Sequence, residues 1–241
     1  MGKLIIKDKD IVVPGETLAQ GMDYLPGRGT HRDGENIIAS HVGLVNISGR
    51  AIKLVPMAGR YIPKKGDTVI AKITDILMTG WRIDINCAYS AIMSMKDATS
   101  EFIARGSDLS RYHKIGDYLM ASVTNVTSQN LIDISLKGPG LRKLYPGRII
   151  NISPSKVPRV IGKKGSMVSM IKLATNTRVM VGQNGLVWLS GEDPKLEIVA
   201  VNTIKKIERE AHLQGLTEKI KEFLEKETGK KITLNVEGGP Q

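Results

Sequence analysis

The stretch from Val160 to Ile171 constrains this chain more than any other part of its sequence. Two glycines, Gly162 and Gly165, flank a pair of lysines, and an apolar segment with helical spacing follows directly. Glycine has no Cβ, so the backbone can turn sharply and approach a ligand closely. A helix that begins after such a turn presents free N–H groups and the positive end of its dipole. We therefore predict a phosphate-binding turn, with a purely structural strand-to-helix turn as the alternative.

The same stretch resembles the GxxG loop of KH domains, which clamp the backbone of single-stranded nucleic acid. Val160 and Ile161 precede the first glycine, and Val168 and Ile171 follow the second at helical spacing, as in that family. The resemblance implies that RNA is held by the loop and by the basic residue just before it. The candidate RNA contacts are Arg159, Gly162, Lys163, Lys164 and Gly165.

A second GxxG stands at Gly182-Gln183-Asn184-Gly185. It lies between two strand-like runs, 178–181 and 186–189, rather than before a helix. Asn-Gly between two strands is typical of a type I′ hairpin turn. We therefore predict that this second loop is structural and has no ligand.

The positive charge of the chain is concentrated in its C-terminal part. The formal net charge is +11, and residues 141–241 alone hold 18 Lys/Arg against 10 Asp/Glu, a net of +8. No acidic residue occurs between Asp133 and Glu192. Ten basic residues lie in that window: Lys137, Arg142, Lys143, Arg148, Lys156, Arg159, Lys163, Lys164, Lys172 and Arg178. Such a stretch attracts polyanions and predicts salt-dependent binding of nucleic acid.

Composition excludes several other classes of protein. The single cysteine, Cys87, rules out an intrachain disulfide and a cysteine-based zinc site. No charge-free apolar run is long enough to span a membrane, and the first residues lack the apolar core of a signal peptide. We expect a soluble, cytoplasmic protein without a cofactor or a bound metal.

The order of strand-like and helix-like patterns predicts a multidomain chain that is mainly β plus α/β. Residues 1–60 are short β-like runs broken by Gly and Pro, and we expect a small N-terminal β domain. Residues 61–140 contain five short strands with a long connection before the fourth, which suggests an OB-fold barrel. Residues 141–228 have the β-α-α-β-β-α order of a type I KH domain followed by one more amphipathic helix. Residues 229–241 read as a mobile tail.

The predicted barrel resembles the RNA-binding module named for ribosomal protein S-one. The resemblance is carried by the opening Gly66-Asp67, by the strand Gly80–Asp84 and by a second opening at Ile115–Asp117. Barrels of this kind stack bases on aromatic rings and line the strand's path with cations. The implied stacking residue is Trp81, for which a place in the core is an equal alternative. The implied cations are Arg82, Arg105, Arg111 and Lys114.

The order of the three domains resembles the RNA-binding cap subunits of the archaeal exosome, the family of ribosomal RNA-processing protein four. Further matching stretches are Asp108–Tyr112, Lys156–Lys163 and Gly215–Ile220. The resemblance implies three copies on a hexameric phosphorolytic ring, with the N-terminal domain docked on the ring. It also implies a non-catalytic role, in which single-stranded RNA is captured and its 3′ end is threaded inward for degradation or processing.

Two other functions stay open at the level of the sequence. A stand-alone RNA-binding regulator, or a translation or transcription factor, would use the same modules without a nuclease ring. A nuclease would need clustered carboxylates for metal ions or a histidine acid–base pair. The aspartates of the predicted barrel alternate with apolar residues on separate strands, which favours a solvated surface over a catalytic cluster.

Overall fold

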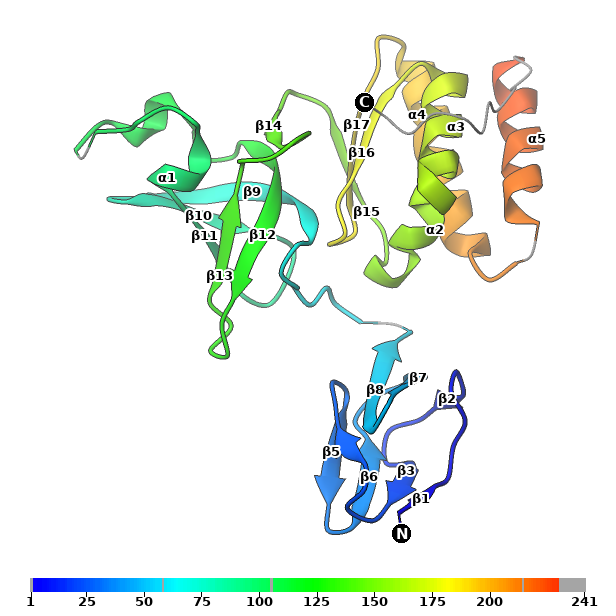
Figure 1. The fold of residues 1–241 in the computed structure, drawn as a ribbon. Helices are drawn as coiled ribbons and strands as arrows, with labels where there is room; N and C mark the ends of the chain where they lie inside the picture. The colour runs from blue at the N-terminus through cyan, green and yellow to red at the C-terminus, as the bar shows by residue number, and fades with distance from the viewer. Residues whose placement is uncertain (1, 58, 105, 214, 230–241) are drawn as a thin grey trace. The chain divides into compact units, whose positions relative to one another are not determined.

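The structure is a computed structural model that describes residues 2–57, 59–104, 106–213 and 215–229. The chain divides into two compact units, Met1–Gly59 and Arg60–Gln241. Figure 1 labels the strands and helices of each unit. The tail predicted over 229–241 lies outside the described residues, apart from Gly229.

The first unit consists of two four-stranded sheets that share one apolar core. One sheet has the order β1 (Lys3–Leu4), β3 (Thr17–Gln20), β6 (Asn36–Ala39), β5 (Thr30–Asp33). The other has the order β2 (Ile11–Val12), β7 (Gly43–Ser48), β8 (Ala51–Pro56), β4 (Leu25–Pro26). The core residues include Val12, Leu18, Ile37, Val45 and Ile52. Along the strands these residues alternate with exposed ones, as expected for sheets with one buried face.

The second sheet of this unit also carries apolar side chains on its outer face. Ile11 lies opposite Leu44, and Leu44 lies opposite Val55, in the registers of β2 with β7 and of β7 with β8. Ile11 is 62% exposed and Val55 is 54% exposed. Val13, Val42 and Met57 lie two residues along the chain from these three, just beyond the strand ends, and are exposed as well. We call these six residues, Ile11, Val13, Val42, Leu44, Val55 and Met57, the outer apolar face.

The second unit begins with a closed five-stranded barrel. The sheet order is β13, β11, β10, β9, β12, and a further pairing of β13 with β12 closes the ring. The barrel strands are β9 (Thr68–Leu77), β10 (Gly80–Asp84), β11 (Ala91–Ser94), β12 (Tyr118–Val126) and β13 (Ile132–Ser135). The helix α1 (Met95–Ala98) follows β11. A sixth strand, β14 (Arg142–Leu144), pairs with β12 outside the ring. The OB-type barrel expected from the sequence is therefore present.

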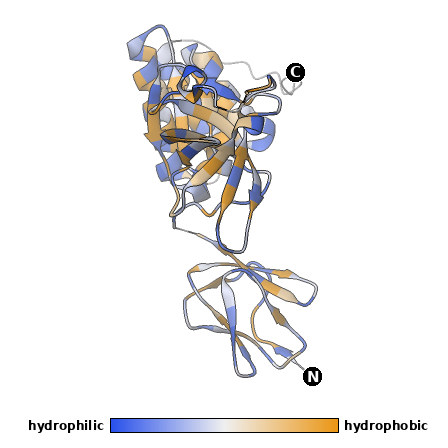
Figure 2. Ribbon diagram, turned by 90° about the vertical axis from the view of Figure 1, so that its left-hand side faces the viewer, coloured by the Kyte–Doolittle hydropathy of each residue, from blue (hydrophilic) through white to orange (hydrophobic). Residues whose placement is uncertain are grey.

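The rest of the second unit is a three-stranded sheet with helices packed on one face. The sheet order is β15 (Arg148–Asn151), β17 (Leu186–Ser190), β16 (Arg178–Val181), all antiparallel. The helices are α2 (Val157–Ile161), α3 (Ser166–Thr175), α4 (Pro194–Glu210) and α5 (Leu216–Thr228). Up to α4 this is the predicted β-α-α-β-β-α order of a type I KH domain. In Figure 2 the helices alternate between hydrophobic and hydrophilic positions, as expected for helices that bury one side.

Candidate nucleic-acid interface

The GxxG turn joins α2 to α3 through two glycines in conformations that other residues avoid. Gly162 has φ 76° and ψ 173°, and Gly165 has φ 79° and ψ 9°. A Cβ on Gly162 would lie 2.7 Å from the backbone nitrogen of Met167, whereas one on Gly165 would meet nothing within 4 Å. The N–H of Gly162 donates to the carbonyl of Pro158, and the N–H of Gly165 donates to the carbonyl of Gly162. The first glycine is therefore required by packing and dihedral angle, and the second by dihedral angle alone.

The two lysines of the turn are exposed where α3 begins. Lys164 has φ 53° and ψ 29°, a left-handed conformation that is uncommon for a lysine. Lys163 and Lys164 are exposed, and the first turn of α3 holds no acidic residue. Arg159, also exposed, stands in the last turn of α2. The structure thus brings three cations to the N-terminus of a helix, where backbone N–H groups and the dipole favour an anion.

The two glycines are expected to differ in their tolerance of alanine. Gly162→Ala should lower the free energy of unfolding by about 2–3 kcal/mol, because it adds a backbone clash to an unfavourable dihedral region. Gly165→Ala should cost only about 1 kcal/mol, the strain of a left-handed residue in open space. Denaturant unfolding of both variants checks this, and equal losses would contradict the packing role given to Gly162.

The second GxxG is a hairpin loop that docks on the barrel. Asn184 is fully buried and lacks the positive φ that a type I′ turn requires at both central residues, so the predicted turn type is wrong. The N–H of Gly185 donates to the carbonyl of Gly182, and Gly185 alone has φ 84°. A Cβ on Gly182 would lie 2.7 Å from the nitrogen of Ile70 in the barrel. Both glycines are therefore explained by packing, consistent with the predicted structural role.

Asn184 makes the central polar contacts between the KH domain and the barrel. Its Oδ1 accepts from the N–H of Ile70 at 3.3 Å, and its Nδ2 donates to the carbonyls of Ile70 at 2.7 Å and Ile85 at 2.9 Å. The neighbouring N–H of Gln183 donates to the carbonyl of Thr68 at 2.9 Å. The loop thereby completes the hydrogen bonding of β9 beyond the end of β10. An apolar cluster also joins the barrel to the KH domain, and we call this whole contact the junction. Its buried residues are Ile70, Met120, Leu144 and Trp188.

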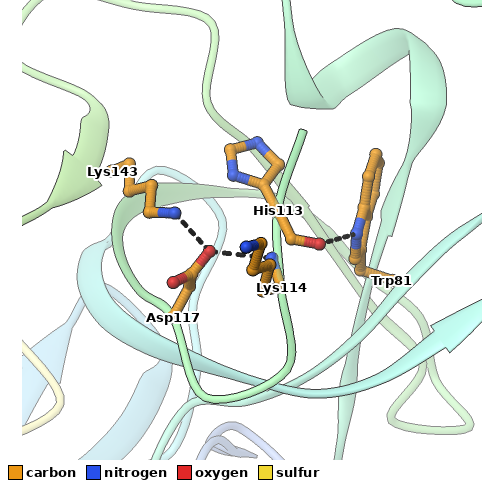
Figure 3. Close-up of polar contacts among 5 residues, drawn as sticks. All are labelled: Trp81, His113, Lys114, Asp117 and Lys143. Atoms are coloured by element: carbon orange, nitrogen blue, oxygen red, sulfur yellow. Dashed lines mark hydrogen bonds and ion pairs between the residues drawn. The ribbon is translucent and has the colours of Figure 1, made fainter. Parts of the chain in front are cut away.

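The structure corrects the stacking role predicted for Trp81. Its side chain is 0% exposed in the barrel core, and its Nε1 donates to the carbonyl of His113 at 3.2 Å (Figure 3). The rings of Trp81 and His113 meet edge to face, with centroids 5.3 Å apart. A base has no access to a ring face in this position. Trp81 therefore acts as a core residue that fixes the loop before β12.

The residues next to Trp81 are held by a small polar network (Figure 3). The N–H of Lys114 donates to Asp117 at 2.8 Å, and Asp117 forms an ion pair with Lys143. The side chain of Lys114 stays exposed. Burial is the largest effect and lowers the pKa of His113. The hydrogen bond to the Ala98 backbone opposes it, and the smaller effects of Lys143 and Asp117 lower and raise the pKa, respectively. The net effect favours the neutral form of the His113 ring.

Arg82 and Arg111, two of the other predicted barrel cations, are exposed, and each has an acidic neighbour. Arg82 lies 3.6 Å from Asp75 on the neighbouring strand, with both side chains about half exposed. Arg111 lies 3.8 Å from Asp108, which also caps the short turn 109–111. Exposed ion pairs of this kind are weak, so both guanidinium groups can exchange their partner for a phosphate. Arg105 lies outside the described residues.

One exposed aromatic of the barrel was missed by the sequence reasoning. Phe102 is 91% exposed, directly beside Ile103, which is buried in the barrel core. The available signal was an aromatic next to Glu101, just before Ile103 and the basic Arg105. Phe102 offers the exposed ring that Trp81 does not.

The described residues contain no group of three or more His, Cys, Asp or Glu side chains that could hold a metal ion. The barrel aspartates have separate partners: Asp84 accepts from the N–H of Asn86, and Asp133 from the side chain of Asn125. Among the helices that the structure describes, none has the length and apolar character needed to cross a membrane.

Comparison with protein-family models gives matches over three successive parts of the chain. Residues 11–48 match the model described as the "Exosome complex exonuclease RRP4 N-terminal region". Residues 60–105 match "RRP4, S1 domain", and residues 147–195 match "KH domain". The three models follow one another in the order of the N-terminal unit, the barrel and the KH domain.

Curated relatives are similar over almost the whole chain. The exosome complex component Rrp4 of Thermococcus kodakarensis is 45% identical over 93% of this chain and 88% of its own length. That of Pyrococcus furiosus is 44% identical over 93% and 86%, and that of Methanothermus fervidus 45% over 92% and 97%. A crystal structure described as a candidate exosome complex RNA-binding protein superposes with a TM-score of 0.63. It is 36% identical and covers 70% of this chain and 97% of its own.

Proposed function

This chain belongs to the Rrp4 family of exosome complex components, and from that premise we propose that it is a non-catalytic RNA-binding subunit of a cytoplasmic exosome. It captures single-stranded RNA and passes the 3′ end to a phosphorolytic ring for 3′–5′ degradation or processing. Its partners are single-stranded RNA and the subunits of a hexameric ring, with three copies of this chain in each complex.

The observation that carries RNA capture is the turn Gly162–Gly165. Two glycines with positive φ let the backbone come close to a ligand, and two exposed lysines stand at a helix N-terminus without an acidic residue in its first turn. These features provide amide donors and ammonium groups for phosphates, and none of them reads a base edge. Capture is therefore expected to depend on charge and strand flexibility more than on RNA sequence.

The barrel is proposed to guide the strand after capture. Arg82, Arg111 and Lys114 are exposed and supply cations, and Arg105 is assigned with them from the sequence. Phe102 is exposed and can stack on a base, whereas Trp81 is buried and cannot. Cations interleaved with one exposed ring suit a path that holds successive nucleotides loosely.

The outer apolar face of the N-terminal unit supports the docking role of that unit. Six apolar side chains lie on β2, β7 and β8 or just beyond the ends of these strands, and exposed apolar patches of this kind mark interaction sites. A ring subunit that covers the patch would remove these side chains from water. We therefore assign the outer apolar face to the contact with the ring.

The test is a pull-down of the tagged full chain from its native organism, followed by native mass spectrometry. We expect two kinds of ring subunit to be recovered in equal copies with this chain. Recovery of the chain alone, or with RNA or ribosomes only, would favour a stand-alone RNA-binding regulator and overturn the exosome role.

The double variant Ile11→Asp with Val55→Asp is expected to reduce recovery of the ring by about tenfold or more, because it places charges in the centre of an apolar contact. RNA binding by the same variant should be unchanged, since the GxxG turn lies in the other compact unit. Met22→Asp, at a 72% exposed side chain of the same unit, is the matched control and should retain the ring. Equal loss from Met22→Asp would show that the outer apolar face is not the contact.

A further inference from the structure

Two cations from different parts of the second unit, Arg142 and Lys172, lie near the edge strand β16 of the KH sheet. The guanidinium Nη2 of Arg142, on β14, lies 4.0 Å from the sulfur of Met180 on β16. Burial lowers the pKa of Lys172, on α3, and the charge of Arg142 lowers it further. Since α3 packs beside β16, Arg142 and Lys172 lie along the same edge strand, although β14 pairs with the barrel.

Neither cation has a carboxylate partner among the residues that the structure describes. Their surroundings explain this, because the chain holds no acidic residue from 134 to 191. The next residue on β14, Lys143, does have one, since it pairs with Asp117. Two exposed cations without a carboxylate partner are available to an anionic ligand.

The position of Arg142 is fixed by the junction between the barrel and the KH domain. Arg142 lies opposite Met120 in the register of β14 with β12, and Met120 belongs to the apolar cluster of the junction. The hydrogen bonds of Asn184 hold the two sides of that junction together. Because side chains alternate along a strand, Arg142 points toward the KH domain while Lys143 points toward the barrel.

We propose that Arg142 and Lys172 form a second phosphate site, which holds the RNA strand where it extends beyond the GxxG turn toward the barrel. This inference rests on the proposed RNA-binding function. Lys172 lies six residues after the start of α3, about 9 Å along its axis from the turn. A guanidinium presents parallel N–H donors that match two phosphate oxygens, and the ammonium adds a point charge. The ligand is an RNA phosphate, and the site makes the barrel and the KH domain one continuous binding surface.

The test compares Arg142→Gln with Lys143→Gln in the full chain, using unstructured RNA oligonucleotides of about four and about ten nucleotides. A KH clamp holds about four nucleotides, so only the longer RNA reaches Arg142. Arg142→Gln should weaken binding of the longer RNA by about tenfold and reduce its log–log salt slope by about 0.7. It should leave the shorter RNA nearly unchanged, and Arg142→Lys should restore part of the affinity.

Lys143→Gln is the matched control, because it removes the same charge from the adjacent residue, whose side chain is paired with Asp117. It should change affinity by less than about twofold. The second site is refuted if Arg142→Gln binds the longer RNA normally, if it weakens both RNAs equally, or if Lys143→Gln has the same effect. The wider function is tested separately by the turn lysines: if their variant loses RNA while Arg142→Gln does not, only the second site fails. Normal RNA binding by both would remove the proposed function as well.

Discussion

Replacing Lys163 and Lys164 together by aspartate is expected to lower the affinity of the full chain for single-stranded RNA by on the order of a hundredfold. Each lysine is assigned one phosphate contact, and a charge-assisted hydrogen bond is worth about tenfold in affinity. Aspartate also tolerates the left-handed conformation of Lys164, where φ is 53°, so the turn itself should survive.

The salt dependence of the same variant reports the mechanism directly. Each phosphate contact contributes about 0.7 to the log–log salt slope for a single strand, so the slope should fall by about 1.4. Fluorescence anisotropy of a labelled oligonucleotide, repeated over a range of salt concentrations, measures affinity and slope together. Loss of affinity with an unchanged slope would point to misfolding of the turn rather than to lost phosphate contacts.

The matched control is Lys195→Asp with Lys205→Asp. Both lysines are exposed on α4, away from the turn in the sequence, and their replacement changes the net charge by the same amount. The control should weaken binding by no more than about threefold, through the long-range field alone. If the control and the turn variant lose affinity equally, the RNA responds only to net charge, and the Gly162–Gly165 turn is not the capture site.

Asn184→Ala is expected to lower the free energy of unfolding of the second unit by about 3–5 kcal/mol. The variant leaves the N–H and carbonyl of Ile70 and the carbonyl of Ile85 without the partner that Asn184 provides. A buried polar group that loses its partner costs about 1–3 kcal/mol. Denaturant unfolding followed by far-UV circular dichroism measures the loss, and the fluorescence of Trp188, which lies at the junction, reports whether the two domains separate first.

Two further variants isolate the cause. Asn184→Asp keeps the size and the acceptor for the N–H of Ile70 but turns an oxygen toward two carbonyls, so it should be as harmful as alanine. Gln183→Ala is the control, because only the backbone N–H of this exposed residue contacts the barrel. If Asn184→Ala unfolds within about 1 kcal/mol of the parent chain, the hydrogen bonds of Asn184 are not what joins the domains.

The turn at Gly162–Gly165 could be predicted because everything that defines it is local. Two glycines, two lysines and the apolar spacing of the next helix lie within a dozen residues, and the backbone angles follow from them. The type I KH order and the five barrel strands were predictable for a similar reason. Their hydrophobic periodicity is strong, and turn residues mark their ends.

For Trp81, the resemblance to the family predicted base stacking, whereas the alternation of buried and exposed residues along the strand predicted a core position. Trp81, Ile83 and Ile85 occupy alternate positions and are all fully buried, while Arg82 and Asp84 between them are exposed. Alternation therefore assigned Trp81 to the core face. The stacking role came only from the family's preference for an aromatic at that place.

Asn184 and β14 could not be predicted because their partners are distant in the sequence. An Asn-Gly pair between two strands predicts a turn, but nothing near it indicates a bond to Ile70, 114 residues earlier. Residues 142–144 were likewise assigned to the KH domain, and only their pairing with β12 makes them part of the barrel sheet.

The long sequence separation between Asn184 and its hydrogen-bond partners affects how the chain folds during synthesis. All five barrel strands, which end at Ser135, leave the ribosome before the loop at 182–185 does. In the newly made barrel, the carbonyl of Thr68 and the N–H and carbonyl of Ile70 therefore lack the hydrogen bonds that Gln183 and Asn184 later provide. An uncovered strand edge can pair with another chain. Arrival of the hairpin ends this interval, so slow synthesis between residues 135 and 185 would prolong the period in which nascent chains can aggregate.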